Sequence, residues 1–389
     1  MKKICVVTAT RAEYGLLRPV IDKLASSEDI ELQLVVTGMH LSPEFGLTYR
    51  EIEEDGYPIR KKIEMLLSSD TEPAITKSMA VALMGFADFF ADDRPDIVVI
   101  LGDRYEMLMT ATAAMIAKIP IAHIHGGELT EGAYDDAIRH SITKMSQLHF
   151  ASTEEYQRRI IQLGECPERV FNVGALGVES IKKIKLLSKE ELEKNLNFSI
   201  QDNTFVVTYH PVTLETFSSE VQFSNLLQVI DRHQEWKVIF TKANADTDGR
   251  IINRMIDEYV GKHNERCIAF SSLGQLRYLS VLQYCSAVVG NSSSGIIEVP
   301  SFHIPTINIG NRQQGRITGG SVIHCGYESS EIEEAINKAL SSEFMEMIKG
   351  YMNPYEGINT SEKIVGKIKE VLAKGIDTKK KFYDIKVSN

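Results

Sequence analysis

The chain has 389 residues, of which 43% are apolar, and a formal net charge of -10. This length exceeds the roughly 250–300 residues at which a single core stops growing, so two domains are expected. The negative charge and the lack of a basic run interleaved with aromatic residues disfavour nucleic acid as a partner, because a phosphate backbone would be repelled.

Membrane insertion and disulfide bonding are not expected either. No uninterrupted run of about 18 apolar residues is present, and the apolar run after Lys2 and Lys3 is too short for a signal peptide. The five cysteines are widely spaced and form no CxxC pair, so neither a disulfide framework nor a zinc site is indicated. These features predict a cytoplasmic protein with buried thiols.

In the first half, short β-branched runs alternate with segments of helical period, which predicts the α/β class with parallel sheets. Strands are expected at residues 4–8, 32–37, 97–101 and 121–124, and around His149 and Val170. Helices are expected at residues 14–24, 75–90, 105–117, 135–145 and 154–163. The absence of a GxGxxG turn after the first strand disfavours NAD binding.

The second half repeats this alternation, with strands expected at residues 205–209, 237–240, 268–270, 287–289 and 306–309. We therefore predict two Rossmann-like, doubly wound domains, residues 1–174 and 175–389, that face a cleft. The amphipathic helix expected at residues 360–373 could pack back on the first domain.

Titratable residues follow the strands of the first half, where α/β enzymes place their chemistry. Arg11 follows the first strand and His40 the second, and Asp103 and Arg104 follow the strand at 97–101. The next strand ends in a second group, which consists of His125, Glu128, Asp135 and Asp136. Each acid alone is typical of a helix cap, but crowded carboxylates in a cleft have raised pKa values and can transfer protons.

Two details of this region leave alternatives open. His123 and His125 would point the same way on a strand, as metal ligands do, but His123 lies inside an apolar strand and no matching ligand set follows, so no metal is expected. Arg139, four residues after Asp135, could pair with it and keep that carboxylate ionised.

The second half contains a turn rich in small residues, GNSSSG, between a strand and a helix start. The hydroxyls and backbone N–H groups of Ser292, Ser293 and Ser294 could cradle a diphosphate, although a serine-rich helix cap is the simpler alternative. Glu298 could accept hydrogen bonds from ribose hydroxyls, and Arg312 could neutralise phosphate.

Polar residues also follow three other strands of this half. His210 in the segment YHPVT, which ends at Thr213, is a candidate donor to phosphate or sugar, although it could merely cap local backbone. Asn244 and Ser271 occupy comparable positions after the next two strands. Ser271 could hold a uracil edge.

Six segments in this order, TATRAEYG, LGDRYE, HIHGGELTEGAYDDAIRHSITK, YHPVT, GNSSSGIIEVP and NIGNRQQGR, resemble the hydrolysing UDP-N-acetylglucosamine 2-epimerases. The resemblance is closest to the bacterial branch that serves sialic and legionaminic acid synthesis. It implies a glycosyltransferase-B type fold, a homodimer, and UDP held mainly by the C-terminal domain.

The resemblance also assigns individual residues. The UDP-binding positions are matched by Arg11, His210, Asn244, Ser292, Ser293, Glu298 and Arg312. Asp103, Arg104, Asp135, Asp136 and His40 match positions around the sugar. Many relatives have Glu where this chain has His125, so His125 or Glu128 is expected to supply one acid/base group.

The resemblance implies conversion of UDP-N-acetylglucosamine and water to N-acetylmannosamine and UDP, through elimination to 2-acetamidoglucal and rehydration. No metal or other cofactor is needed for this chemistry. The HIHGG segment also resembles relatives that act on a UDP-2,4-diacetamido-trideoxy sugar, which is the first alternative. A glycosyltransferase of the same fold and a catalytically silent nucleotide-sugar sensor are the others.

Overall fold

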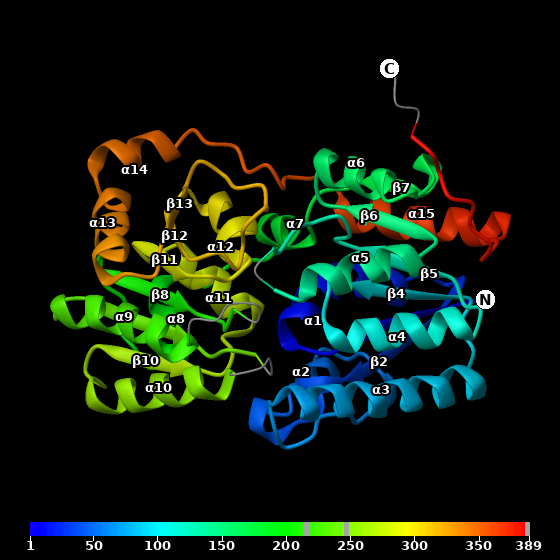
Figure 1. Cartoon of the computed structure of the whole chain (residues 1–389), viewed down its shortest axis with the longest axis horizontal. Coiled ribbons are helices and arrows are strands. Elements are labelled where there is room, and N and C mark those ends of the chain that lie inside the picture. Colours follow the sequence, from blue (N-terminus) through cyan, green and yellow to red (C-terminus); the bar gives the residue numbers. More distant parts are fainter. Residues whose placement is uncertain (132, 213–217, 245–248, 386–389) are drawn as a thin grey trace. The chain divides into compact units, whose positions relative to one another are not determined.

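The computed structural model describes residues 1–131, 133–212, 218–244 and 249–385, so Thr213 of the YHPVT segment lies outside the described residues. By its internal contacts the chain divides into two compact units. Unit 1 comprises Met1–Glu128, Asp135–Ser180 and Tyr355–Asn389, and unit 2 comprises Leu129–Tyr134 and Ile181–Pro354. Each unit has its own parallel sheet with flanking helices (Figure 1).

Within its described residues, unit 1 contains one seven-stranded parallel sheet in the order β3-β2-β1-β4-β5-β6-β7. Its strands are β1 (Lys2–Thr8), β2 (Ile30–Thr37), β3 (Ile59–Ile63), β4 (Ile97–Leu101), β5 (Ile121–Ile124), β6 (Leu148–Ala151) and β7 (Val170–Asn172). The strand order reverses between β1 and β4, and in open α/β sheets ligands bind at such a reversal.

The helices of unit 1 follow from amphipathic patterns and local caps. They are α1 (Arg11–Ala25), α2 (Tyr49–Glu54), α3 (Glu72–Asp92), α4 (Tyr105–Ile116), α5 (Asp135–Met145), α6 (Glu154–Gln162), α15 (Thr360–Lys374) and α7 (Leu176–Lys183), which continues into unit 2 after Ser180, with 3-10 turns at Gly38–Leu41, Pro43–Phe45 and Pro167–Arg169. The helix α15 packs against α1, and Ile364, Ile368 and Leu372 join the core formed by β1, β2 and β4. The end of the chain therefore completes the unit that begins it.

Unit 2 has a six-stranded parallel sheet in its described residues, in the order β10-β9-β8-β11-β12-β13. The strands are β8 (Thr204–Thr208), β9 (Lys237–Thr241), β10 (Cys267–Phe270), β11 (Ala287–Gly290), β12 (Thr306–Ile309) and β13 (Val322–Cys325). The helices are α8 (Lys189–Leu196), α9 (Ser219–Arg232), α10 (Gly249–Lys262), α11 (Gly274–Leu282), α12 (Ser294–Ile297), α13 (Ser329–Ala339) and α14 (Ser342–Ile348), with a 3-10 turn at Val299–Phe302. Phe205, Phe223 and Phe240 are buried in its core.

The predicted α/β class with two Rossmann-like parallel sheets is confirmed. The expected strands 97–101, 121–124 and 306–309 and the helix 135–145 coincide with β4, β5, β12 and α5. Two strands at sheet edges, β3 and β13, were not predicted. In β3 the central residues are Arg60, Lys61 and Lys62, and such charges on an edge strand hide the apolar pattern.

The helix α3 is, among the described helices, long and apolar enough by length and composition alone to cross a membrane. In the structure α3 packs beside α4 (Figure 1), and Phe86, Phe89 and Phe90 are buried. These contacts are those of a helix that packs one face on its α/β unit, while other residues of α3 such as Met84 are exposed.

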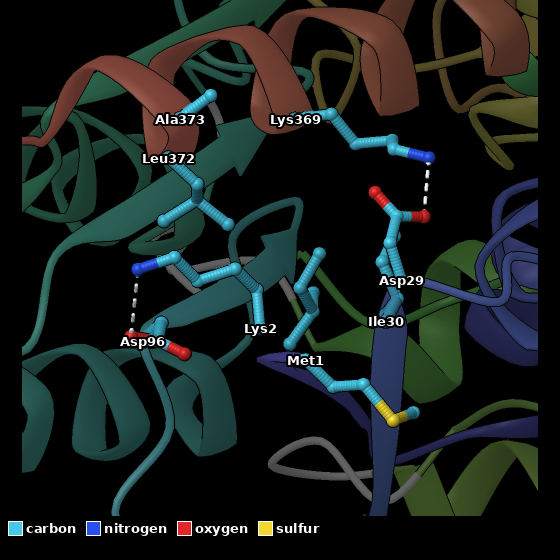
Figure 2. Close-up of a pocket in the computed structure, with 9 residues that line it drawn as sticks. Met1, Lys2, Asp29, Ile30, Asp96, Lys369, Leu372 and Ala373 are labelled. Carbon is cyan, nitrogen blue, oxygen red and sulfur yellow. Dashed lines mark hydrogen bonds and ion pairs between the residues drawn. The ribbon is translucent and has the colours of Figure 1, made fainter.

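A surface hollow of about 420 Å³ lies at the amino ends of β1 and β2, the opposite sheet edge from the predicted site residues. Figure 2 shows its two ion pairs, Lys2 with Asp96 at 3.6 Å and Lys369 with Asp29 at 2.7 Å. None of the residues that line it was predicted to be functional.

Candidate active site

The carboxyl ends of the parallel strands bring the predicted residues of unit 1 to one sheet edge. Arg11 starts α1 after β1, His40 lies in the 3-10 turn after β2, Asp103 follows β4, and His125 follows β5. Because β4 and β5 are neighbouring strands, Asp103 and His125 follow the carboxyl ends of adjacent strands.

Arg139 organises the acidic part of this edge. Its side chain is 1% exposed and forms an ion pair with Asp103. It also donates from Nη1 to the backbone oxygen of Glu128 at 2.9 Å, and the same nitrogen lies 3.9 Å from Asp136. The sequence suggested Asp135 as a partner of Arg139, and the structure adds Asp103, at the strand end of β4, as a partner. This buried cation favours the ionised form of Asp103.

His125 is held in an uncommon backbone conformation beside a buried carboxylate. Its φ is 63°, in the left-handed region that non-glycine residues rarely adopt. Nδ1 lies 3.6 Å from Oε1 of Glu128, and Nε2 accepts from the backbone N–H of Leu176 at 3.5 Å. Oε1 of Glu128 also accepts from the hydroxyl of Ser152 at 2.8 Å. An accepting Nε2 places the proton of a neutral imidazole on Nδ1, facing Glu128.

His123 supports the turn that carries Asp103. It is fully buried, as expected for a core residue, and its Nε2 lies 2.7 Å from the backbone oxygen of Gly102 while Nδ1 lies 3.2 Å from the hydroxyl of Thr143. Since a carbonyl can only accept, Nε2 carries the proton. Burial lowers the pKa of His123 to about 3, which keeps the ring neutral. Across the described residues, no cluster of three His, Cys, Asp or Glu side chains could hold a metal ion.

Asp135 and Asp136 occupy the first turn of α5, where a carboxylate complements the helix dipole. Both are partly exposed, and Asp136 lies 3.6 Å from Nε2 of His140. Together with Asp103 and the buried pair of His125 and Glu128, they give unit 1 several groups that can exchange protons.

Three predicted binding residues of unit 1 already contact other residues of the unit. Arg11 pairs with Glu51 of α2. His40 is fully buried, with its ring nitrogens 3.0 Å and 2.8 Å from the hydroxyls of Thr8 and Thr48, and burial lowers its pKa to about 3. This geometry gives His40 the role of holding the turn after β2 in place.

Arg104 is the third of these residues. Its Nε and Nη2 donate to the two carboxylate oxygens of Glu106, each at 3.1 Å.

In unit 2, Asn291 joins two of the predicted segments. Its side chain is fully buried, accepts from the backbone N–H of His210 at 2.7 Å and donates to the backbone oxygen of His210 at 2.7 Å. The preceding residue, Gly290, has φ of 138°, and an added Cβ would overlap the backbone oxygen of Thr208. The turn therefore needs glycine and asparagine at these two positions.

The three serines after Asn291 are partly exposed at the carboxyl end of β11. The N–H of Ser294 points to the hydroxyl of Ser292 at 3.4 Å, and the hydroxyl of Ser294 donates to Tyr278 at 2.7 Å. Ser293 is the N-cap residue of α12, which has four residues, and Glu298 is its C-cap residue. A helix this short contributes a small dipole, so hydroxyls and backbone N–H groups are the main anion donors here.

Arg312 lies beside this turn, because its Nη1 donates to the backbone oxygen of Asn291 at 3.1 Å. Asn244 follows β9 in a segment that Asn253 holds through the N–H and carbonyl of Ala243, at 2.7 and 3.2 Å. Ser271 is exposed at the end of β10. The predicted residues of unit 2 thus share one sheet edge, which is rich in hydrogen-bond donors.

Sequence reasoning missed Glu106, Asn291 and the contact of Arg139 with Asp103. The one sequence signal for Glu106 is its place in the segment LGDRYE, two residues after Arg104. Asn291 lies inside GNSSSG, but its contact with His210 joins residues 81 positions apart.

Comparison with known proteins shows which proteins this chain resembles. Residues 22–369 match the UDP-N-acetylglucosamine 2-epimerase family. A Campylobacter jejuni protein named GDP/UDP-N,N'-diacetylbacillosamine 2-epimerase (hydrolyzing) is 46% identical over 88% of this chain and 88% of its own length. The polysialic acid biosynthesis protein P7 of Escherichia coli is 42% identical over 99% of this chain and 98% of its own. The crystal structure of a Neisseria meningitidis UDP-GlcNAc 2-epimerase bound to UDP-GlcNAc shares the fold, with a TM-score of 0.79 and 19% identity over 95% of this chain and 100% of that chain.

Proposed function

This chain belongs to the UDP-N-acetylglucosamine 2-epimerase family, and we propose that it is a hydrolysing epimerase that converts UDP-N-acetylglucosamine and water to N-acetylmannosamine and UDP. The observation that carries the proposal is the Asp103–Arg139 ion pair beside the buried His125 and Glu128. A nucleotide-binding module alone has no need for these coupled groups.

Loss of UDP before proton removal makes the chemistry feasible. The proton on C2 of the sugar is not acidic, because no carbonyl adjoins that carbon. Cleavage of the C1–O bond places positive charge on C1, which makes the C2 proton removable and yields 2-acetamidoglucal. Water then adds its hydroxyl to C1, and a proton reaches C2 from the opposite face.

The two proton transfers need groups of different environment, and unit 1 offers them. Asp103 is kept ionised by Arg139 and suits the role of base. His125 can exchange a proton with Glu128, and Asp135 and Asp136 offer further acids at the partly exposed start of α5. Each well-placed group contributes a rate factor of roughly 10²–10⁴.

Unit 2 supplies the groups that would stabilise the leaving UDP. The hydroxyls and N–H groups of Ser292, Ser293 and Ser294 would hold the diphosphate, with Arg312 and His210 completing its charge balance. Glu298 would accept from the ribose, while Asn244 and Ser271 lie at the neighbouring strand ends. Arg11 would leave Glu51 to reach a phosphate.

UDP-N,N'-diacetylbacillosamine is the second candidate substrate. It is favoured by the 46% identity to the Campylobacter jejuni protein, whose name includes this sugar and both GDP and UDP. The 42% identity to the polysialic acid biosynthesis protein P7 supports a place in nonulosonic acid synthesis in either case. The chemistry at C1 and C2 is the same for both sugars.

Incubation in D₂O with each UDP-sugar, followed by proton NMR, tests the function and the substrate together. We expect UDP and a free sugar that is epimerised and deuterated at C2. Asp103→Asn should abolish deuteration, whereas Asp202→Asn, at a loop residue of unit 2, should not. Release of sugar with unchanged C2 would indicate plain hydrolysis, and no turnover of either sugar would favour a transferase or a sensor.

Three further predictions remain part of this proposal. We propose that the enzyme is cytoplasmic and forms a homodimer without metal or organic cofactor. Light scattering of the purified chain should give twice the monomer mass of 43.6 kDa, and turnover should persist in a metal chelator.

A further inference from the structure

Glu106 lies in a part of unit 1 that the proposed reaction does not yet use. It is the second residue of α4, its side chain is fully buried, and its two oxygens accept from Nε and Nη2 of Arg104. A cation held through these two nitrogens has both its position and its plane fixed. The side chain of Arg104 is 12% exposed, so little solvent screens the pair.

The carboxylate of Glu106 reaches toward the place where the strand order reverses. A Cβ added to Gly38, at the end of β2, would meet Oε1 of Glu106 at 3.0 Å and Cβ of Ala9, after β1, at 3.2 Å. Glu106 therefore lies among the ends of β1, β2 and β4, where a parallel sheet binds its ligand.

A second buried carboxylate lies beside the pair. Oε2 of Glu13 accepts from the backbone N–H groups of Ala9 and Thr10 at 2.8 and 3.0 Å. Burial raises the pKa of Glu13 to about 7, and Arg104 acts in the opposite direction while Glu106 adds to the increase. Because Glu106 already balances the charge of Arg104, the cluster is close to neutral when Glu13 holds a proton.

Charge balance matters at the step in which UDP leaves. An uncompensated guanidinium near the sugar would repel the positive charge that develops on C1, and it would also compete for the diphosphate. A guanidinium neutralised by a buried carboxylate keeps its hydrogen-bond geometry without this repulsion.

We propose that Glu106 is a positioning residue that holds Arg104 as a charge-balanced hydrogen-bond donor to the sugar. This role rests on the proposed function and extends it, because it gives Glu106 a part in the orientation of Arg104 toward the sugar. Glu106 itself touches Arg104 and not the reacting atoms.

Steady-state kinetics of Glu106→Gln test the role. We expect kcat to fall roughly 30- to 100-fold, as for loss of an oriented donor, while KM changes by less than about threefold and inhibition by UDP is unchanged. Glu106→Asp should recover about tenfold of the loss, because it restores the carboxylate. The exposed Glu53→Gln, which removes the partner of Lys62, is the matched control.

Arg104→Lys provides the second arm and replaces the first if Glu106→Gln does not fold. It should lower kcat to a similar extent. The kcat of the double variant should lie within about twofold of that of the less active single variant, because both substitutions break the same pair of Arg104 and Glu106. Additive losses, or losses that disappear after correction for the folded fraction, would overturn the role. A wild-type chain inactive on both sugars would overturn the proposed function and this role with it, whereas an active wild type with Glu106→Gln within about threefold would overturn the role alone.

Discussion

Unit 1 ends its strands in charged side chains that are paired with one another, whereas unit 2 ends its strands in glycine, serine and asparagine. In unit 1, Arg139 pairs with Asp103 and Arg104 with Glu106. In unit 2, Asn291 and Asn253 hold loops through backbone hydrogen bonds. The first edge carries charges that are fixed before any ligand arrives, and the second combines neutral donors with the cation of Arg312, which suits a ligand that brings its own charge.

This difference suits the two parts of a nucleotide sugar. A proton-transfer group must keep its protonation state and position, so its partners are built into the protein. A diphosphate is already ionised, so backbone N–H groups and hydroxyls, with Arg312 beside them, can bind it without a built-in proton-transfer group. The predictions below test whether each edge depends on its own kind of interaction.

The largest effect is expected from Gly290→Ala in unit 2. The new Cβ would overlap the backbone oxygen of Thr208 at a φ of 138°. We expect a loss of at least about 3 kcal/mol in the free energy of unfolding and no detectable UDP binding. Urea unfolding and calorimetry measure both, and Gly261→Ala, where a Cβ meets nothing within 4 Å, is the control. A Gly290→Ala protein that binds UDP normally would show that this turn tolerates a side chain.

Arg139→Met tests whether unit 1 depends on its built-in charge. The change leaves Asp103 without its buried cation, and because Asp103 keeps some solvent contact, we expect a loss of about 2–4 kcal/mol. Turnover should fall at least about 100-fold, with UDP binding intact. The exposed Arg254→Met is the control, expected within about 0.5 kcal/mol of wild type. Normal turnover of Arg139→Met would show that the reaction does not depend on the ion pair of Asp103 with Arg139.

Asn291→Ala and Asn253→Ala compare two similar contacts of unit 2. Asn291 satisfies the N–H and carbonyl of the buried His210, so its loss should cost about 2–3 kcal/mol. Asn253 holds Ala243 with one short and one longer hydrogen bond, and its loss should cost about 1–2 kcal/mol. Urea unfolding gives both values. A larger loss for Asn253→Ala would mean that the hydrogen bonds of Asn291 to His210 stabilise the unit less than those of Asn253 to Ala243.

The smallest effect is a pH dependence that arises from Glu13 of unit 1. The pKa of Glu13 is raised by burial from 4.5 to about 7, so the folded state binds more protons between these values. The stability contributed by protonated Glu13 is therefore present below pH 4.5 and lost as pH rises through about 7. Glu13→Gln, which stays neutral, should gain roughly 1–2 kcal/mol relative to wild type between about pH 5 and pH 8. A constant difference between the two proteins across this range would mean that Glu13 is ionised throughout.

Much of the fold could be predicted from local pattern. The runs at 97–101 and 121–124 are apolar throughout because both faces of a parallel strand are covered, and they coincide with β4 and β5. The edge strands β3 and β13 lacked that signal, since one side of each is open. The division into units also follows contacts that no single boundary after Gly174 describes, because α15 returns to α1.

For the candidate site residues, too, positions along the chain were predictable, whereas contacts between residues distant in sequence were not. The sequence by itself determined which residues stand at the strand ends, because chain direction and strand length place Asp103, His125 and the GNSSSG turn at the carboxyl edges. Only the tertiary structure decided their partners. Arg139 of α5 could be matched to Asp135 by helical spacing, but the contact of its buried guanidinium with Asp103, which follows β4, appears only in the fold. Local spacing determines which residues are close along a helix or strand. The pairing of buried charges depends instead on which groups, distant in sequence, the fold brings together in an interior that excludes water.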